Sequence, residues 1–102
     1  MKRASPYGHR AVRCAFGATL RAARDKQGVT QDQLAVRCDF DRTYPSLLER
    51  GLRQPTLHTL LRLADALDIG ATELVAETVS RLRGAVQVGS ETVARLESGD
   101  RP

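Results

Sequence analysis

The chain has 102 residues, which is enough for one domain with a modest core and short tails. Hydrophobic residues make up 41% of it but aromatic residues only 4%, and Leu and Ala dominate the apolar set. This bias favours packed helices, because β-branched and aromatic residues are the ones typical of strands. No apolar run approaches the ~20 residues that span a bilayer, and the basic start lacks the apolar stretch of a secretory signal. We expect an all-α cytoplasmic protein.

The net charge of +4 is unevenly distributed along the chain. Residues 1–30 carry seven basic side chains and one acidic side chain, whereas the remaining 72 residues carry nine Arg and eleven acids. Arg outnumbers Lys by 14 to 2. Guanidinium groups suit bidentate contacts with phosphate and guanine, although a high-GC genome that encodes Arg in place of Lys gives the same bias. Charge alone permits a nucleic acid, an anionic membrane or an acidic partner.

The two cysteines, Cys14 and Cys38, are isolated and form no CxxC motif. Both fall where we expect small apolar residues in packed helices, where a free thiol behaves as a small hydrophobe. Together with His9 and His58 they lack the spacing of a metal site. We therefore expect structural thiols in a reducing cytosol, with no metal and no cofactor.

Capping residues and hydrophobic spacing predict the first three helices. The first spans residues 15–26, and its start could lie as early as Ser5. Thr30 begins a segment with the S/T-x-x-Q form of a capping box, which predicts the start of a short second helix. After a tight turn, Asp41 is expected to cap a third helix that runs to about Arg50.

Two further helices follow. Thr56 is expected to cap the fourth, whose Leu and Ala residues recur at helical spacing and form the clearest amphipathic pattern of the chain. The fifth spans residues 71–83, after which the pattern weakens and Ser90 caps at most a short helix. The expected divisions are a basic N-terminal arm or helix extension at 1–14, a helix-turn-helix domain at 15–83 and a C-terminal tail at 84–102, which could form a short helix or a dimer contact.

The second and third helices are expected to be about eight residues each and separated by three, which is the spacing of a helix-turn-helix. In this motif the second of the two helices is braced across the first and offered to the major groove of DNA. Ala35 is small where the two helices must cross, and Phe40 is apolar where the turn must be fixed to the core. Gln31 stands at a helix N-terminus, where the dipole and free N–H groups attract phosphate.

Several motifs occur together, in order and at a characteristic spacing. They are Phe16-Gly17-x-x-Leu20-Arg21, Gly28-Val29-Thr30-Gln31-x-x-Leu34-Ala35, Leu48-Glu49-Arg50-Gly51, Arg53-x-Pro55-Thr56-Leu57-x-Thr59-Leu60, Leu63-Ala64-x-Ala66-Leu67 and Glu73-Leu74. In these motifs the sequence resembles the XRE (Cro/repressor-type) helix-turn-helix family, over about 60 of the 102 residues. The resemblance implies a compact five-helix bundle that binds specific double-stranded DNA, usually as a two-fold dimer.

The resemblance also assigns roles by position. The residues implied to read bases on the third helix are Arg42, Thr43, Ser46 and Leu47. Those implied to hold the DNA backbone are Thr30, Gln31, Tyr44, Arg50 and Arg53, with a thymine methyl as the alternative contact of Tyr44 and a solvated surface charge as the alternative for the two arginines. Arg42 is the strongest candidate, since a bidentate Arg–guanine contact contributes about 1–3 kcal/mol of discrimination.

Three positions depart from the family pattern. Asp39 occupies the turn position that is usually Gly, where it tolerates the left-handed conformation at some cost. Pro45 falls at the expected fourth position of the third helix, so we expect that helix to start late or bend. Arg42 and Thr43 would then project differently from the family norm. Leu47 is apolar where polar residues usually face the groove, so it contacts a thymine methyl or belongs to a protein interface.

The leading interpretation is a sequence-specific DNA-binding transcriptional regulator of the repressor or controller type, acting as a homodimer in a bacterial or phage setting. The candidate dimer residues, for which core packing is the alternative, are Val79, Leu82, Val86 and Val88. The other interpretation is a protein-interaction adaptor or antitoxin that keeps the fold without reading DNA. Glu49 has no suitably spaced second carboxylate or nucleophile and is expected to pair with an Arg. We expect neither an enzyme nor a small-molecule ligand.

Overall fold

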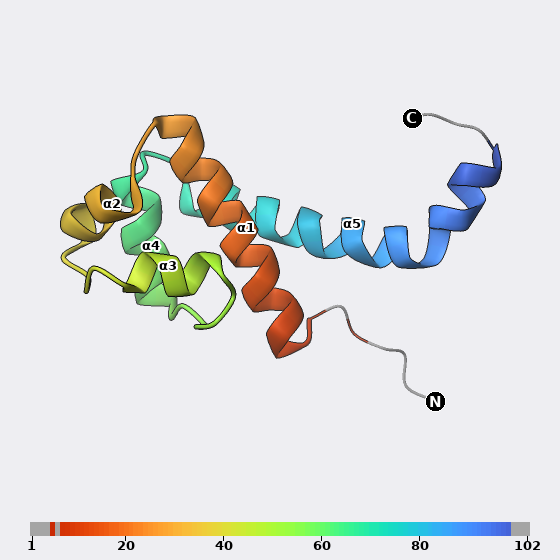
Figure 1. The fold of residues 1–102 in the computed structure, drawn as a ribbon, viewed down its shortest axis with the longest axis horizontal. Coiled ribbons are helices and arrows are strands. Elements are labelled where there is room, and N and C mark those ends of the chain that lie inside the picture. The colour runs from red at the N-terminus through yellow and green to blue at the C-terminus, as the bar shows by residue number, and fades with distance from the viewer. Residues whose placement is uncertain (1–4, 6, 99–102) are drawn as a thin grey trace.

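The computed structural model describes residue 5 and residues 7–98, with side chains up to residue 84, and this part of the chain contains five α-helices and no strand (Figure 1). The helices are α1 (His9–Gln27), α2 (Gln31–Cys38), α3 (Tyr44–Glu49), α4 (Leu57–Ala66) and α5 (Ala71–Ser98). The predicted all-α class is therefore confirmed. None of the helices within the described ranges is long and apolar enough to cross a membrane.

Two helices are longer than the sequence predicts. α1 begins at His9, within residues 1–14, for which the sequence allowed either a basic arm or an extension of the first helix. α5 continues to Ser98, so the predicted end near residue 83 and the separate short helix after Ser90 are wrong. Gly84 weakens the helix without ending it, because a glycine inside a helix costs only about 1 kcal/mol relative to Ala.

The turn between α2 and α3 follows one prediction and corrects another. Asp39 adopts the expected left-handed conformation, with φ of 56°. The delayed start of α3 is also confirmed, since Pro45 is its second residue, where a missing N–H removes no helical hydrogen bond. However, Thr43 is the N-cap instead of Asp41. The Asp41 carboxylate accepts hydrogen bonds from the hydroxyl and the backbone N–H of Thr43, which lower the pKa of Asp41 and close the turn ahead of the helix.

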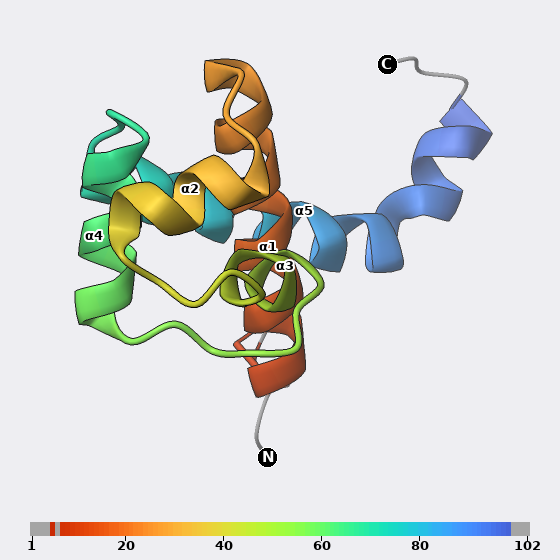
Figure 2. The same ribbon diagram turned by 60° about the vertical axis from the view of Figure 1, so that its left-hand side comes forward.

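A leucine core joins all five helices. The leucines that are almost completely buried are Leu20, Leu34, Leu48, Leu63, Leu67 and Leu74. Each contributes roughly 1.5–3 kcal/mol relative to an exposed side chain. Phe40 packs against this core from the turn, as predicted, and meets the Tyr44 ring edge to face at 5.2 Å. Figure 2 shows the packed helices from a second direction, with α2 lying across α3.

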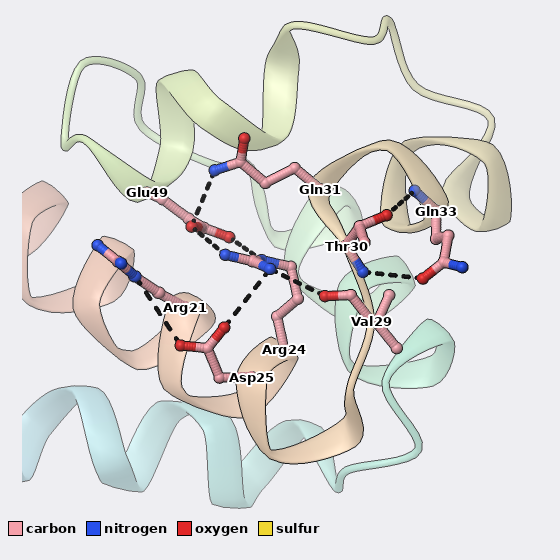
Figure 3. Close-up of polar contacts among 8 residues, drawn as sticks. All are labelled: Arg21, Arg24, Asp25, Val29, Thr30, Gln31, Gln33 and Glu49. Atoms are coloured by element: carbon pink, nitrogen blue, oxygen red, sulfur yellow. Dashed lines mark hydrogen bonds and ion pairs between the residues drawn. The ribbon is translucent and has the colours of Figure 1, made fainter.

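A buried ion pair links α1 to the end of α3 (Figure 3). The Arg24 side chain is 12% exposed and that of Glu49 is 5% exposed. Arg24 Nε lies 2.6 Å from Glu49 Oε2, and Nη2 lies 3.0 Å from Oε1. Arg24 Nη1 also donates to the carbonyl of Val29 at 2.8 Å, just ahead of α2. The predicted pairing of Glu49 with an Arg is confirmed, and the hydrogen bonds to Glu49 raise the pKa of Arg24.

Gly17 lets α1 approach α3 closely enough for this pair to form. A Cβ at position 17 would lie 2.5 Å from the carbonyl oxygen of Leu48 and 2.6 Å from that of Glu49. Gly17 and Arg24 are two helical turns apart and therefore share one face of α1. A larger residue at position 17 would push the last turn of α3 away from Arg24.

We predict that Gly17→Ala lowers the free energy of unfolding by roughly 1–3 kcal/mol, because the added methyl overlaps rigid backbone atoms of α3. Urea denaturation followed by circular dichroism measures this change. The control is Gly84→Ala, where a Cβ meets nothing within 4 Å and the helix gains up to about 1 kcal/mol. A Gly17→Ala protein as stable as the original would contradict the close contact.

Removing one partner of the ion pair is predicted to be costly. Glu49→Ala should lower the free energy of unfolding by about 3–5 kcal/mol, because it leaves the buried Arg24 charge without its counter-ion. The matched control is Asp25→Ala, whose exposed carboxylate lies 3.5 Å from the same guanidinium and should contribute less than about 1 kcal/mol. Equal losses from the two variants in the same urea experiment would refute this account.

Candidate nucleic-acid interface

The N-terminus of α2 is closed by the predicted capping box. Thr30 Oγ1 accepts from the backbone N–H of Gln33 at 3.0 Å, and Gln33 Oε1 accepts from that of Thr30 at 2.9 Å. The N–H groups of Gln31 and Asp32 belong to the same first turn, where no intrahelical acceptor exists. Together with the helix dipole, these N–H groups form a surface suited to a phosphate. The Thr30 hydroxyl, predicted to contact the DNA backbone, takes part in the cap.

Gln31 is positioned by the buried ion pair (Figure 3). Its Nε2 donates to Glu49 Oε1 at 3.0 Å, so the side chain is held between α2 and α3 and is half-buried. A carboxamide has two N–H donors, and one of them is used here. The phosphate contact expected of Gln31 can therefore use the second amide hydrogen or the backbone N–H. Glu49 orients this group from within the domain, since its own side chain is buried.

Arg42 and Thr43 lie before α3 and not within its first turn, which corrects their expected position on the third helix. The cause is the late start of the helix at Tyr44, ahead of Pro45. Both side chains are exposed. They can still enter a groove, but from a turn whose shape depends on the Asp41 carboxylate.

Arg42 forms an ion pair with Asp32 of α2. Its Nε lies 3.3 Å from Asp32 Oδ1, and its Nη2 lies 3.2 Å from Oδ2. The two side chains are 81% and 61% exposed, so the pair contributes little to stability and can open. The contact uses the Nε and Nη2 edge of the Arg42 guanidinium and thereby fixes the direction in which the rest of the group points. Sequence reasoning missed this role of Asp32, because it treated the residue only as part of the capping box.

Ser46 and Arg50, to which the resemblance assigned different roles, lie together. Arg50 Nε donates to Ser46 Oγ at 3.2 Å across one helical turn. Leu47 is half-buried, and its carbonyl accepts from the N–H of Leu52 at 2.9 Å, which closes the end of α3. Tyr44 is also half-buried, and its ring packs against the core and Phe40.

The loop after α3 carries the exposed Arg53. Within the described chain, its hydrogen bond is to the neighbouring carbonyl of Leu52, at 3.5 Å. Arg13 of α1 fixes the start of the same loop, since its Nε donates to the carbonyl of Gly51 at 3.0 Å. Sequence reasoning counted Arg13 only within the basic N-terminal third, where no local signal marks a contact 38 residues away.

The remaining predicted residues lie apart from this surface. On α5, Val79 is half-buried and Leu82 is buried, whereas the side chains of Val86 and Val88 lie outside the described residues. Cys38 is buried as expected, and burial raises the pKa of its thiol. The expectation for Cys14 is wrong: it is exposed, and its thiol lies beside Gly51 of the loop after α3 and not in the core. Among the described residues, no three His, Cys, Asp or Glu side chains gather into a metal site.

Comparisons with known proteins agree with this geometry. A family model described as a helix-turn-helix domain matches residues 15–77. The HTH-type transcriptional regulator y4dJ of Sinorhizobium fredii is 40% identical over 67 residues, which cover 66% of this chain and 87% of y4dJ. The crystal structure of the clp gene regulator ClgR from Corynebacterium glutamicum has a TM-score of 0.71 at 32% identity and covers 83% of this chain and 88% of its own. That of the restriction-modification controller protein C.AhdI from Aeromonas hydrophila has a TM-score of 0.61 at 42% identity, covering 63% and 97%.

The matched segment runs from α1 into α5 and contains the whole α2–turn–α3 unit. The expected five-helix fold, with the helix-turn-helix at its second and third helices, is confirmed by the structure and by these neighbours. The chain therefore belongs to the helix-turn-helix domain family, as its resemblance to XRE-type repressors implied.

Proposed function

We propose that this protein is a transcriptional regulator that binds a specific double-stranded DNA site as a homodimer. The observation that carries the proposal is the α2–turn–α3 unit, in which the buried Arg24–Glu49 pair holds Gln31 at the start of α2. A phosphate at that helix N-terminus would set the depth at which α3 enters the major groove. Relatives described as transcriptional regulators and controller proteins support this assignment.

The proposed roles follow from where the side chains lie. Base contacts come from the turn and the exposed side of α3 and use Arg42, Thr43, Ser46 and the partly exposed Leu47. Phosphate contacts come from Thr30 and Gln31 at the start of α2, from Tyr44 at the start of α3, and from Arg50 and Arg53 at and after its far end. Phosphate contacts on both sides of the base-reading residues fix the register of the unit on the duplex. Such a protein acts without catalysis, in a bacterial or phage-infected cytoplasm.

A protein-interaction adaptor or antitoxin remains the second candidate. Leu47 and the exposed Leu52 are joined by a backbone hydrogen bond, so the α3 end presents apolar groups beside the basic ones. Selection from random duplexes separates the two functions. A regulator should enrich one palindrome, with half-sites ~34 Å apart or a multiple of that, and prefer it by ~10³ or more over random DNA. Failure to enrich any sequence would exclude the regulator and leave the adaptor.

We predict different consequences for two arginines when the selected duplex is titrated by fluorescence anisotropy. Arg42→Ala should relax discrimination at one base pair per half-site, by about 1–3 kcal/mol, because a guanine contact is lost. Arg53→Ala should weaken binding to every sequence alike and reduce the salt slope by about 0.9 per phosphate contact removed. Arg21, exposed on α1, provides a matched control whose removal should change neither. Equal effects of Arg42→Ala and Arg53→Ala would overturn the assignment of roles.

A further inference from the structure

One face of α1 follows the end of α3 and then the loop after it. Gly17 touches α3, since a Cβ at position 17 would lie 2.5 Å from the carbonyl oxygen of Leu48. About one turn earlier, Arg13 Nε donates to the carbonyl of Gly51 at 3.0 Å. Arg10 lies on the same face a further turn towards the N-terminus, because residues three and four apart in a helix are neighbours. The start of α1 therefore lies beside the loop, as Figures 1 and 2 both show.

The two segments that meet at this contact carry no acidic side chain. Residues 1–24 contain six basic residues and residues 50–64 contain three, and neither segment contains Asp or Glu. Four of these arginines flank the contact and form what we call the arginine surface, namely Arg10, Arg13, Arg50 and Arg53. Arg13 is half-buried and the other three are exposed, and none of the ion pairs among the described residues involves them. Cations gathered without carboxylates repel one another, and a polyanion relieves that repulsion.

Arg13 is positioned to bind an anion with the outer end of its guanidinium. The group has five N–H donors, and the Gly51 carbonyl uses the one on Nε. Within the described residues, no hydrogen bond uses the four hydrogens on Nη1 and Nη2. A pair of guanidinium N–H groups matches two oxygens of one phosphate. Because the Nε contact already holds the guanidinium, Arg13 loses little side-chain freedom when it binds.

We infer that the arginine surface binds the phosphate backbone of the duplex where it continues beyond each half-site, with Arg10 and Arg13 as the additional contacts. This assignment rests on the proposed function, which places Arg50 and Arg53 on phosphates. Arg13 contacts the loop between those two residues, so a strand held by them passes beside the start of α1. Duplex DNA presents a phosphate about every 3.4 Å along each strand, which supplies the next partners. Both additional residues precede the matched helix-turn-helix segment, which begins at residue 15.

Neutral variants of the two α1 residues provide the first test. In anisotropy titrations of the full chain with the selected duplex, Arg10→Gln and Arg13→Gln should each weaken binding roughly tenfold, because each removes a charge-assisted hydrogen bond. Each should reduce the salt slope by about 0.9 and leave the discrimination between base pairs unchanged.

The matched control is Lys26→Gln, which removes a positive charge from the opposite face of α1. Lys26 is exposed and borders a cavity with Glu73 of α5, away from the arginine surface. Its removal should leave the affinity and the salt slope nearly unchanged. Equal losses in all three variants would show an effect of net charge alone and contradict the phosphate contacts.

A modified duplex tests whether the contact is direct. In this duplex, uncharged methylphosphonate linkages replace the phosphates just outside each half-site. The original protein should bind it roughly tenfold more weakly than the unmodified duplex, whereas Arg10→Gln should lose little further, because its partner charge is already absent. Arg10 makes no hydrogen bond within the described residues, so circular dichroism should give its variant the melting transition of the original. Independent, additive losses from the protein and DNA changes would refute the contact.

Failure of these contacts and failure of the proposed function give different results. If the original protein selects a palindrome but Arg10→Gln and Arg13→Gln bind it as Lys26→Gln does, the α1 contacts are wrong and the regulator stands. If the original protein selects no sequence, yet Arg10→Gln and Arg13→Gln weaken its binding to random duplex, the regulator is wrong and the arginine surface stands. If it binds no duplex at all, both are wrong.

Discussion

The buried ion pair between Arg24 and Glu49 is the contact on which the rest of the domain depends. It joins the last turn of α1 to the end of α3, and the same guanidinium binds the carbonyl of Val29 ahead of α2. Removing two charges from water is expensive, so such a pair adds little net stability, although breaking it costs several kcal/mol. Its effect is to allow one arrangement of these three helices. Gly17 makes that arrangement possible, because any side chain there would separate α1 from α3.

The surface proposed to bind DNA depends on this contact for its geometry. Gln31 is held by the carboxylate that Arg24 neutralises, so the proposed phosphate site at the start of α2 and the buried pair form one connected network. On the other side, Pro45 shortens α3 and leaves Arg42 in a turn, where Asp32 of α2 directs its guanidinium. An arginine in a turn, held by a carboxylate, presents its guanidinium differently from an arginine within a helix. Because both partners of the Arg42–Asp32 pair are exposed, salt weakens the contact that directs Arg42.

α5 both completes the domain core and extends beyond it. Its N-terminal half contributes Leu74 and Leu82 to the core, whereas Val75 stays exposed in the groove between α1, α4 and α5. The C-terminal part of α5 leads away from the other four helices, as Figures 1 and 2 show.

The sequence by itself determined the features that depend on neighbours a few residues apart. The capping box at Thr30, the left-handed Asp39 and the delay of α3 by Pro45 were all predictable, because caps, turns and proline act within one helical turn. The family motifs likewise indicated the five-helix fold. Only the tertiary structure decided that Glu49 meets Arg24 and Gln31, that Asp32 holds Arg42, and that Cys14 is exposed beside the loop at Gly51. The pairs Arg24–Glu49, Gln31–Glu49 and Asp32–Arg42 lie 25, 18 and 10 residues apart along the chain. No periodic pattern in the sequence encodes which polar groups the packing of α1, α2 and α3 will bring together.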